Sequence, residues 1–180
     1  MLFARTRTSG GKATGLFITV AAMAAVFVFP VEAASKQPST DSSEVEVTRN
    51  NYGFTSAEIC FMRKINGVRQ RNGLGPLRWD KQMGYVARKH ARQMSNNGNV
   101  YHDENMGSEI TRWRRLGQNT GGGRSCRSLS RSFMRSPSHR ANILGAWKYI
   151  GVGTANRGSK VYVQQIFENY DDPGNVYHFP

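Results

Sequence analysis

The stretch Phe133–Leu144, with the sequence FMRSPSHRANIL, carries more structural information than any other part of this chain. Pro137 disfavours helical geometry at Ser136, so a helix that runs up to Met134 is expected to end there. The Ser-Pro-Ser sequence then turns the chain, and His139 follows at the turn. Because loops carry function more often than regular elements, His139 is a candidate site residue.

The first 33 residues have the pattern of a secretory signal peptide. A basic start precedes an apolar run from Leu16 to Phe29, and small residues then favour cleavage before Ala34. The apolar run is shorter than the roughly 20 residues that a membrane-spanning helix needs. We therefore predict a secreted, extracellular protein that associates with a membrane or a cell wall. An uncleaved membrane anchor is the alternative.

Positive charge dominates the composition. The whole chain has a formal net charge of +13, and residues 34–180 retain 22 basic and 11 acidic residues, a net charge of +11. Such a secreted protein is expected to bind an anionic surface, either membrane lipid or cell-wall polymer, with an unidentified protein as the other candidate partner. No DNA-reading motif accompanies the basic residues, so we predict no specific nucleic-acid partner. We expect a monomer.

Cys60 and Cys126 are the two cysteines of the chain. In an exported protein two cysteines are expected to form a disulfide. Closing a loop of this length would stabilise the fold by roughly 4 kcal/mol in the chain-entropy model. Two unrelated buried thiols are the alternative, and no Cys-x-x-Cys motif indicates a metal cluster.

Helical patterns come first along the chain. Thr55 and Glu58 form a capping box that predicts a helix over 56–71. A second helix, with Asp80 as its cap, is predicted from the recurring apolar spacing of Met83, Val86, Ala87, His90, Ala91 and Met94. A short helix around Trp113 is expected within 108–116, and a third long helix over 125–135.

Strand patterns come last. Residues 149–155 and 160–167 are rich in β-branched side chains and flank a turn, which predicts a hairpin. Helices followed by a hairpin indicate an α+β fold with an antiparallel sheet. Residues 117–123 are interpreted as a glycine-rich link. The predicted organisation is a signal peptide at 1–33, a flexible linker at 34–54, one domain at 55–170 and a C-terminal tail at 171–180.

Two histidines, His102 and His139, are the candidate site residues. Imidazole is the commonest acid–base group near neutral pH and a frequent ligand of divalent metals. Two histidines alone are weak evidence for zinc, because a tight zinc site needs three or four protein ligands.

Further motifs occur in a fixed order along the chain: Asn66-x-x-Arg69, Gly75-Pro76-Leu77-x-Trp79-Asp80, Ala87-x-x-His90-Ala91-x-x-Met94, Asn97-Gly98, His102, Gly117-Gln118-Asn119, Gly151-Val152-Gly153 and Tyr162-Val163-Gln164-Gln165-x-Phe167. Together with the stretch around His139, this order resembles the CAP superfamily, which groups cysteine-rich secretory proteins, antigen 5 and pathogenesis-related-1, in its bacterial SCP-like form. The resemblance covers residues 56–168.

This resemblance implies a three-layer α-β-α sandwich with a central antiparallel sheet and a cleft that holds two histidines and two acids. His102 and His139 match the two histidines. Gln118 stands where the family has a glutamate, and Ser136 lies near the position of the second acid. Both carboxylates are therefore missing from this chain, although Glu104 and Glu109 lie close to His102 in sequence.

The missing carboxylates decide between two functions. Gln118 is neutral and cannot act as a general base, so only weak binding of a divalent metal such as zinc by His102 and His139 is expected. We predict a non-enzymatic binding module for lipid, cell-wall polymer or a protein partner. The alternative is a metal-assisted hydrolase, a peptidase or an esterase, that uses His102 and His139. A secreted toxin or host-interaction factor would use the same scaffold.

Overall fold

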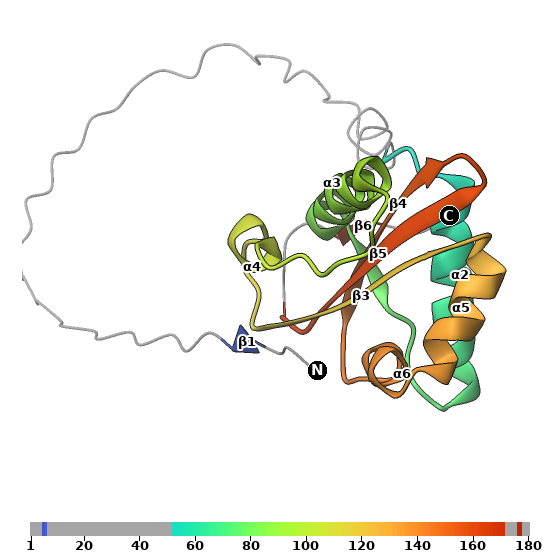
Figure 1. Ribbon diagram of the computed structural model, residues 1–180. Coiled ribbons are helices and arrows are strands. Elements are labelled where there is room, and N and C mark those ends of the chain that lie inside the picture. The colour runs from blue at the N-terminus through green and yellow to red at the C-terminus, as the bar shows by residue number, and fades with distance from the viewer. Residues whose placement is uncertain (1–4, 7–51, 172–175, 178–180) are drawn as a thin grey trace, which may run out of the picture.

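The computed structural model describes residues 5–6, 52–171 and 176–177 (Figure 1). The rest of the predicted signal peptide, its cleavage site, linker residues 34–51 and most of the C-terminal tail lie outside the described residues. None of the described helices combines the length and the hydropathy that a membrane-spanning segment requires.

The described chain forms three layers, as predicted. The helices are α2 (Ser56–Arg71), α3 (Lys81–Asn97), α4 (Met106–Glu109), α5 (Cys126–Arg135) and α6 (Pro137–Ile143). The strands are β1 (Arg5–Thr6), β2 (Arg78–Asp80), β3 (Arg115–Gly123), β4 (Tyr149–Arg157), β5 (Lys160–Glu168) and β6 (Val176–Tyr177). Figure 1 shows α3 and α4 on one side of the sheet and α2, α5 and α6 on the other. The predicted α+β sandwich is therefore confirmed.

The long strands β3, β5 and β4 pair antiparallel in that order, in a sheet with the order β1-β3-β5-β4-β2-β6. The predicted hairpin is β4 and β5, which pair from Tyr149 and Glu168 to Arg157 and Lys160. The sheet is not antiparallel throughout, because β2 runs parallel to β4.

The predicted caps and disulfide are present. The Thr55 side chain accepts from the Glu58 amide and the Glu58 carboxylate accepts from the Thr55 amide, so α2 begins with a capping box. The Asp80 carboxylate accepts from the Met83 amide at 2.8 Å and caps α3. Cys60 and Cys126 form the disulfide, which joins α2 to α5.

Residues 117–123 are not a link, as we predicted, but most of strand β3. The strand pattern was obscured because glycines replace side chains where helices lie against the backbone. A Cβ at Gly121 would lie 2.7 Å from the Phe133 ring, and one at Gly117 would lie 2.9 Å from the Trp147 ring. These glycines let Phe133 of α5 and Trp147, in the segment between α6 and β4, pack directly on β3.

Three other expectations are corrected. His139 does not lie in a turn: Pro137 ends α5 but also occupies the first turn of α6, a position that proline tolerates. The short helix predicted within 108–116 is α4, which ends at Glu109, before Trp113.

Tyr52 lies in the predicted linker but is buried, and its ring packs 5.3 Å from that of Trp79. The packed domain therefore begins before residue 55.

Helix α3 lies unusually close to β4. A Cβ at Gly153 would be 2.0 Å from the Arg88 amide nitrogen, and one at Gly151 would be 2.3 Å from the carbonyl carbon of Met83. These neighbours are backbone atoms of α3 and cannot rotate away as side chains do. The Gly151-Val152-Gly153 motif therefore permits backbone-to-backbone packing of the helix on the sheet.

We predict that Gly153→Ala lowers the free energy of unfolding by about 3 kcal/mol or more, because the added methyl group would force α3 away from the sheet. Urea unfolding of the oxidised protein measures the change. Gly75→Ala is the matched control: Gly75 has open space around its Cβ position, and its replacement should change stability by less than about 1 kcal/mol. Equal stabilities of the two variants would contradict the packing argument.

The sheet also buries two carboxyl groups, those of Glu168 on β5 and Asp80 on β2. Glu168 is fully buried, and neither of its carboxyl oxygens has a hydrogen-bond partner among the described residues. Burial, with a smaller contribution from Asp80, raises the pKa of Glu168 to about 8. Burial also raises the pKa of Asp80 to about 6. Glu168 is therefore protonated in the folded protein at neutral pH.

This burial predicts a stability that falls as pH rises. Between about pH 4.5 and pH 8 the unfolded chain releases the Glu168 proton while the folded protein retains it. Glu168→Gln removes this contribution. The free energy of unfolding of the variant, measured relative to that of the parent protein, should therefore rise by about 2 to 4 kcal/mol from pH 5 to pH 8. Urea unfolding at both pH values tests this, and a stability difference that does not change with pH would contradict it.

Candidate functional site

His139 lies in the first turn of α6, three residues after Ser136, the N-cap of that helix. Its half-buried ring packs 4.9 Å from the ring of Phe133, measured between centroids. The Ser136 hydroxyl lies 3.3 Å from that of Ser138. The Phe133–Leu144 stretch thus places His139 on a short helix rather than on a flexible turn.

Asparagines attach this helix to the sheet. The buried Asn119 side chain donates to the His139 carbonyl oxygen at 3.2 Å and to Gln165 Oε1 at 3.1 Å. Asn142 of α6 donates to the carbonyl oxygen of Gln118 and to Asn119 Oδ1, both at 2.9 Å. This network holds the backbone of His139 against the middle of β3.

His102 lies in the loop between α3 and α4, and its neighbours on both sides are hydrogen-bonded to the core. The buried His90 donates through Nε2 to the Tyr101 carbonyl oxygen at 2.8 Å. Gln118 accepts from the Asp103 amide at 3.0 Å and donates to the Asp103 carbonyl oxygen at 2.9 Å. His102 itself is exposed, between these two attached residues.

The surroundings of His139 lower its pKa below the ordinary value. Partial burial is the main cause, and an electrostatic contribution from His102 adds to it. His102 lies in the α3–α4 loop, and His139 lies on α6. Gln118 lies between these elements on β3, bonded to the loop through its side chain and to α6 through its carbonyl oxygen.

The acids near His102 in sequence do not complete a metal site. Glu109 pairs with Lys89 at 2.7 Å, and Glu104 is exposed. Among the described residues, no group of three or more His, Cys, Asp or Glu side chains could hold a metal ion. Since a protein zinc site needs at least three ligands, the donor set around His102 and His139 does not fit zinc.

The structure also shows roles that sequence analysis missed. His90 was considered only as part of the apolar stripe of the second helix, but it also holds the loop that carries His102. Gln118 was treated as a lost acid, but its amide matches the two main-chain groups of Asp103. An amide can both accept from the N–H and donate to the C=O, whereas a carboxylate can only accept. Long-range pairs of this kind are not visible in a linear sequence.

Comparison with known proteins identifies the family of this chain. The model of the cysteine-rich secretory protein family, CAP, matches residues 62–167. The chain belongs to the CAP family. The match spans α2 to β5, and so includes both histidines and the strand that separates them.

Individual CAP relatives are distant. The Bacillus subtilis (strain 168) protein YkwD, itself uncharacterized, is 28% identical over 143 residues, which is 74% of this chain and 55% of YkwD. The chain thus spans about half the length of that relative. Among solved structures, an outer surface protein of Borrelia burgdorferi has a TM-score of 0.59 at 15% identity, over 66% of this chain and 97% of the Borrelia protein.

An extracellular protein of Bacillus anthracis that contains an SCP domain has a TM-score of 0.54 at 22% identity, over 74% of this chain and 45% of that protein. These likenesses show the fold. They assign no ligand to the CAP domain described here.

We predict that His102→Ala raises the pKa of His139, because the replacement removes an electrostatic contribution that lowers this pKa while leaving the burial of His139 unchanged. Two-dimensional NMR of the imidazole resonances between pH 4 and pH 8 measures the pKa of His139 in the parent protein and in the variant. The pKa of His139 in the parent protein should lie below the ordinary value of 6.5. An identical His139 titration in the variant would show that the histidines do not interact.

Gln118→Glu is predicted to lower the free energy of unfolding by about 2 kcal/mol at pH 7. A carboxylate cannot donate to the Asp103 carbonyl oxygen and would place two acceptors against each other. Gln70→Glu, the same change on the exposed surface of α2, should leave stability within about 0.5 kcal/mol. If Gln118→Glu is as stable as that control, the amide is not required by the loop.

Proposed function

We propose that this CAP-domain protein is an exported, non-catalytic binding module that attaches to an anionic surface. The observation that supports the proposal best is the unbalanced positive charge of the folded domain. Glu104 and Asp171 are the exposed acids of the described residues, and Asp171 is already paired with Arg114 and Lys148. Most exposed arginines and lysines therefore remain available to an anionic partner.

The histidine site supports binding rather than hydrolysis. The Gln118 amide is hydrogen-bonded to the Asp103 main chain and to Gln164 Nε2, at 3.1 Å, and it carries no charge. It can neither take a proton from water nor raise the basicity of a histidine as a carboxylate would. Export is supported by the signal-like N-terminal sequence and by the extracellular SCP-domain protein of Bacillus anthracis that shares the fold.

Sedimentation with anionic surfaces tests the proposal. We expect the protein to co-sediment with phosphatidylglycerol vesicles or with isolated cell-wall sacculi at low salt, and to be released at high salt as the charges are screened. The double variant His102→Ala, His139→Ala should bind equally well. Absence of the protein from every pellet at low salt would contradict the proposed function.

The alternative hydrolase makes a different prediction. If His102 and His139 support hydrolysis, the purified protein cleaves peptide or ester substrates, and the same double variant loses that rate. We expect no histidine-dependent rate above that of the double variant. A rate that the double replacement abolishes would establish the hydrolase in place of the binding module.

A further inference from the structure

Helix α5 carries a row of exposed arginines. Arg127, Arg131 and Arg135 recur every four residues along the helix, and Arg124 precedes its N-cap. Four residues correspond to a rise of about 6 Å, so each turn of α5 presents one guanidinium group on neighbouring parts of its surface. We call these four residues the arginine row.

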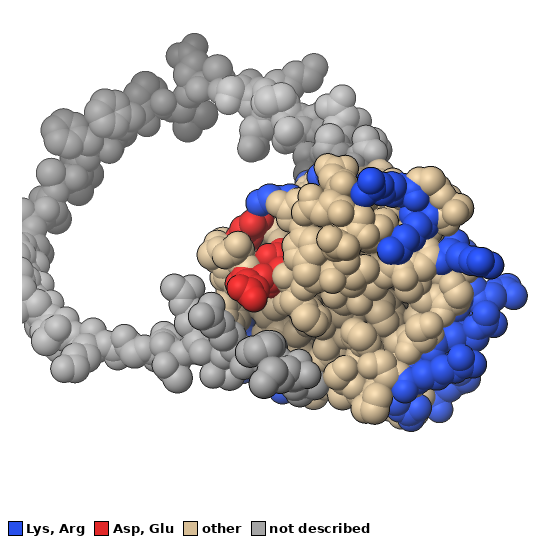
Figure 2. Space-filling model, viewed as in Figure 1, with Lys and Arg blue, Asp and Glu red and all other residues tan. Residues whose placement is uncertain are grey.

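The surroundings of the arginine row add charge of the same sign. Exposed cations on the neighbouring helices are Arg63, Lys64 and Arg71 of α2 and Arg140 of α6. Within α2, α5 and α6 the only acid is Glu58, which is buried and paired with Arg88 at 2.6 Å. Figure 2 shows lysine and arginine side chains gathered along the edge of the molecule where Figure 1 places α5 and α2.

No described residue neutralises the arginine row. The lysines and arginines that form ion pairs among the described residues are Arg88, Lys89, Arg114 and Lys148, all outside α5. The Cys60–Cys126 disulfide joins α5 to α2, so the two basic helices are held together covalently. The result is a fixed ridge of positive charge rather than scattered single residues.

The surface formed by α2, α5 and α6 exposes no large hydrophobic side chain among the described residues that could bind an apolar group. The exposed large hydrophobic residues of the described chain are Tyr85, Val100 and Tyr101, none of which lies on α2, α5 or α6. Stacking of nucleic-acid bases needs exposed aromatic rings, and insertion into a bilayer needs exposed apolar side chains. A partner of this face must therefore be bound through its charges.

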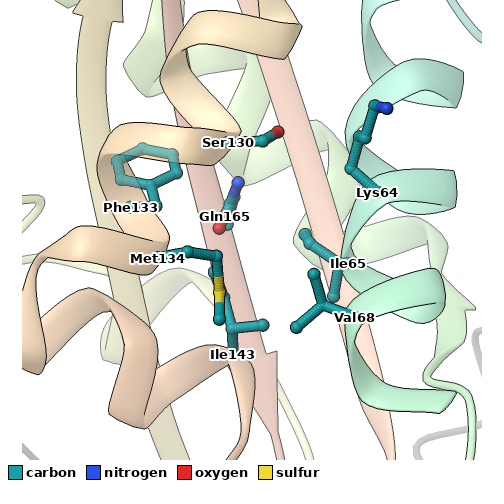
Figure 3. A pocket seen from close by; sticks show the side chains of 8 residues that line it. All are labelled: Lys64, Ile65, Val68, Ser130, Phe133, Met134, Ile143 and Gln165. Carbon is teal, nitrogen blue, oxygen red and sulfur yellow. The ribbon is translucent and has the colours of Figure 1, made fainter. Parts of the chain in front are cut away.

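The gap between α2 and α5 is also too small for an acyl chain. Figure 3 shows Lys64 and Ser130 on opposite sides of this gap, with Phe133, Met134 and Ile143 lining it. The cavity there has a volume of about 10 Å³, the space of roughly one water molecule. A lipid tail does not fit into this cavity. A partner must therefore bind to the exposed arginine row and not between the two helices.

We propose that the arginine row binds a linear phosphodiester polymer without bases, such as the phosphate-linked polyols of cell walls. This inference rests on the proposed function and names the face and the class of ligand. The fork of a guanidinium group matches the two free oxygens of a phosphodiester. A flexible chain of phosphodiesters can follow a ridge that presents one guanidinium per helical turn, whereas a single small anion would use one arginine.

The test uses fluorescently labelled poly(glycerol phosphate) and the triple variant Arg127→Gln, Arg131→Gln, Arg135→Gln. We expect the parent protein to bind the polymer with an affinity that falls steeply with salt, and the triple variant to bind at least tenfold more weakly at 50 mM salt. Its plot of log affinity against log salt should be shallower by about 2, if three phosphate contacts are lost. Circular dichroism confirms that the variant is folded.

A matched control, the triple variant Arg78→Gln, Arg92→Gln, Arg112→Gln, removes the same charge elsewhere. These three arginines are exposed and lie outside α2, α5 and α6. The inference requires this control to lose less than threefold. Equal losses in both variants would overturn it, as would tighter binding to poly-glutamate or to phosphatidylglycerol vesicles than to poly(glycerol phosphate). Failure of the parent protein to bind any of the three probes would instead overturn the proposed function.

Discussion

The close contact of α3 with β4 is the constraint on which the rest of the structure depends. Gly151 and Gly153 leave the backbone of β4 bare, so the backbone of α3 rests directly on it. At the other end of α3, Tyr162 of β5 donates to the carbonyl oxygen of Gly98, the C-cap of the helix, at 2.9 Å. The loop that carries His102 starts there. A small shift of α3 would therefore move His102 relative to His139.

Much of the fold could be predicted because its signals are local. Thr55, Glu58 and Asp80 cap helices through contacts only three residues apart, and Pro137 ends α5 through its own ring. Strand β3 could not be recognised, because its glycines serve partners such as Phe133 and Trp147 that are distant in sequence. Pattern analysis detects side chains that a segment carries, but not side chains that a distant element places against it.

The candidate site shows the same division. The motif order selected His102, Gln118, Ser136 and His139 as candidate residues, and His102 contributes to the lowered pKa of His139. The reason for glutamine at position 118 appears only in three dimensions, where its amide pairs with both main-chain groups of Asp103. Sequence analysis treated Gln118 as the replacement of a lost acid, whereas in the structure its side chain holds the loop that carries His102. The exposed charge of the α2–α5–α6 layer then becomes the stronger indication of function.

We propose that the protein acts through the exposed arginines and lysines of α2, α5 and α6 and not through its histidines. Titration of ¹⁵N-labelled protein with poly(glycerol phosphate), followed by two-dimensional NMR, distinguishes the two sites. We predict shifts of the backbone amides of α5 and of the neighbouring residues of α2 and α6, with those of His102, Asp103 and Gln118 unchanged. Shifts confined to the amides around His102, Gln118 and His139 would contradict the account.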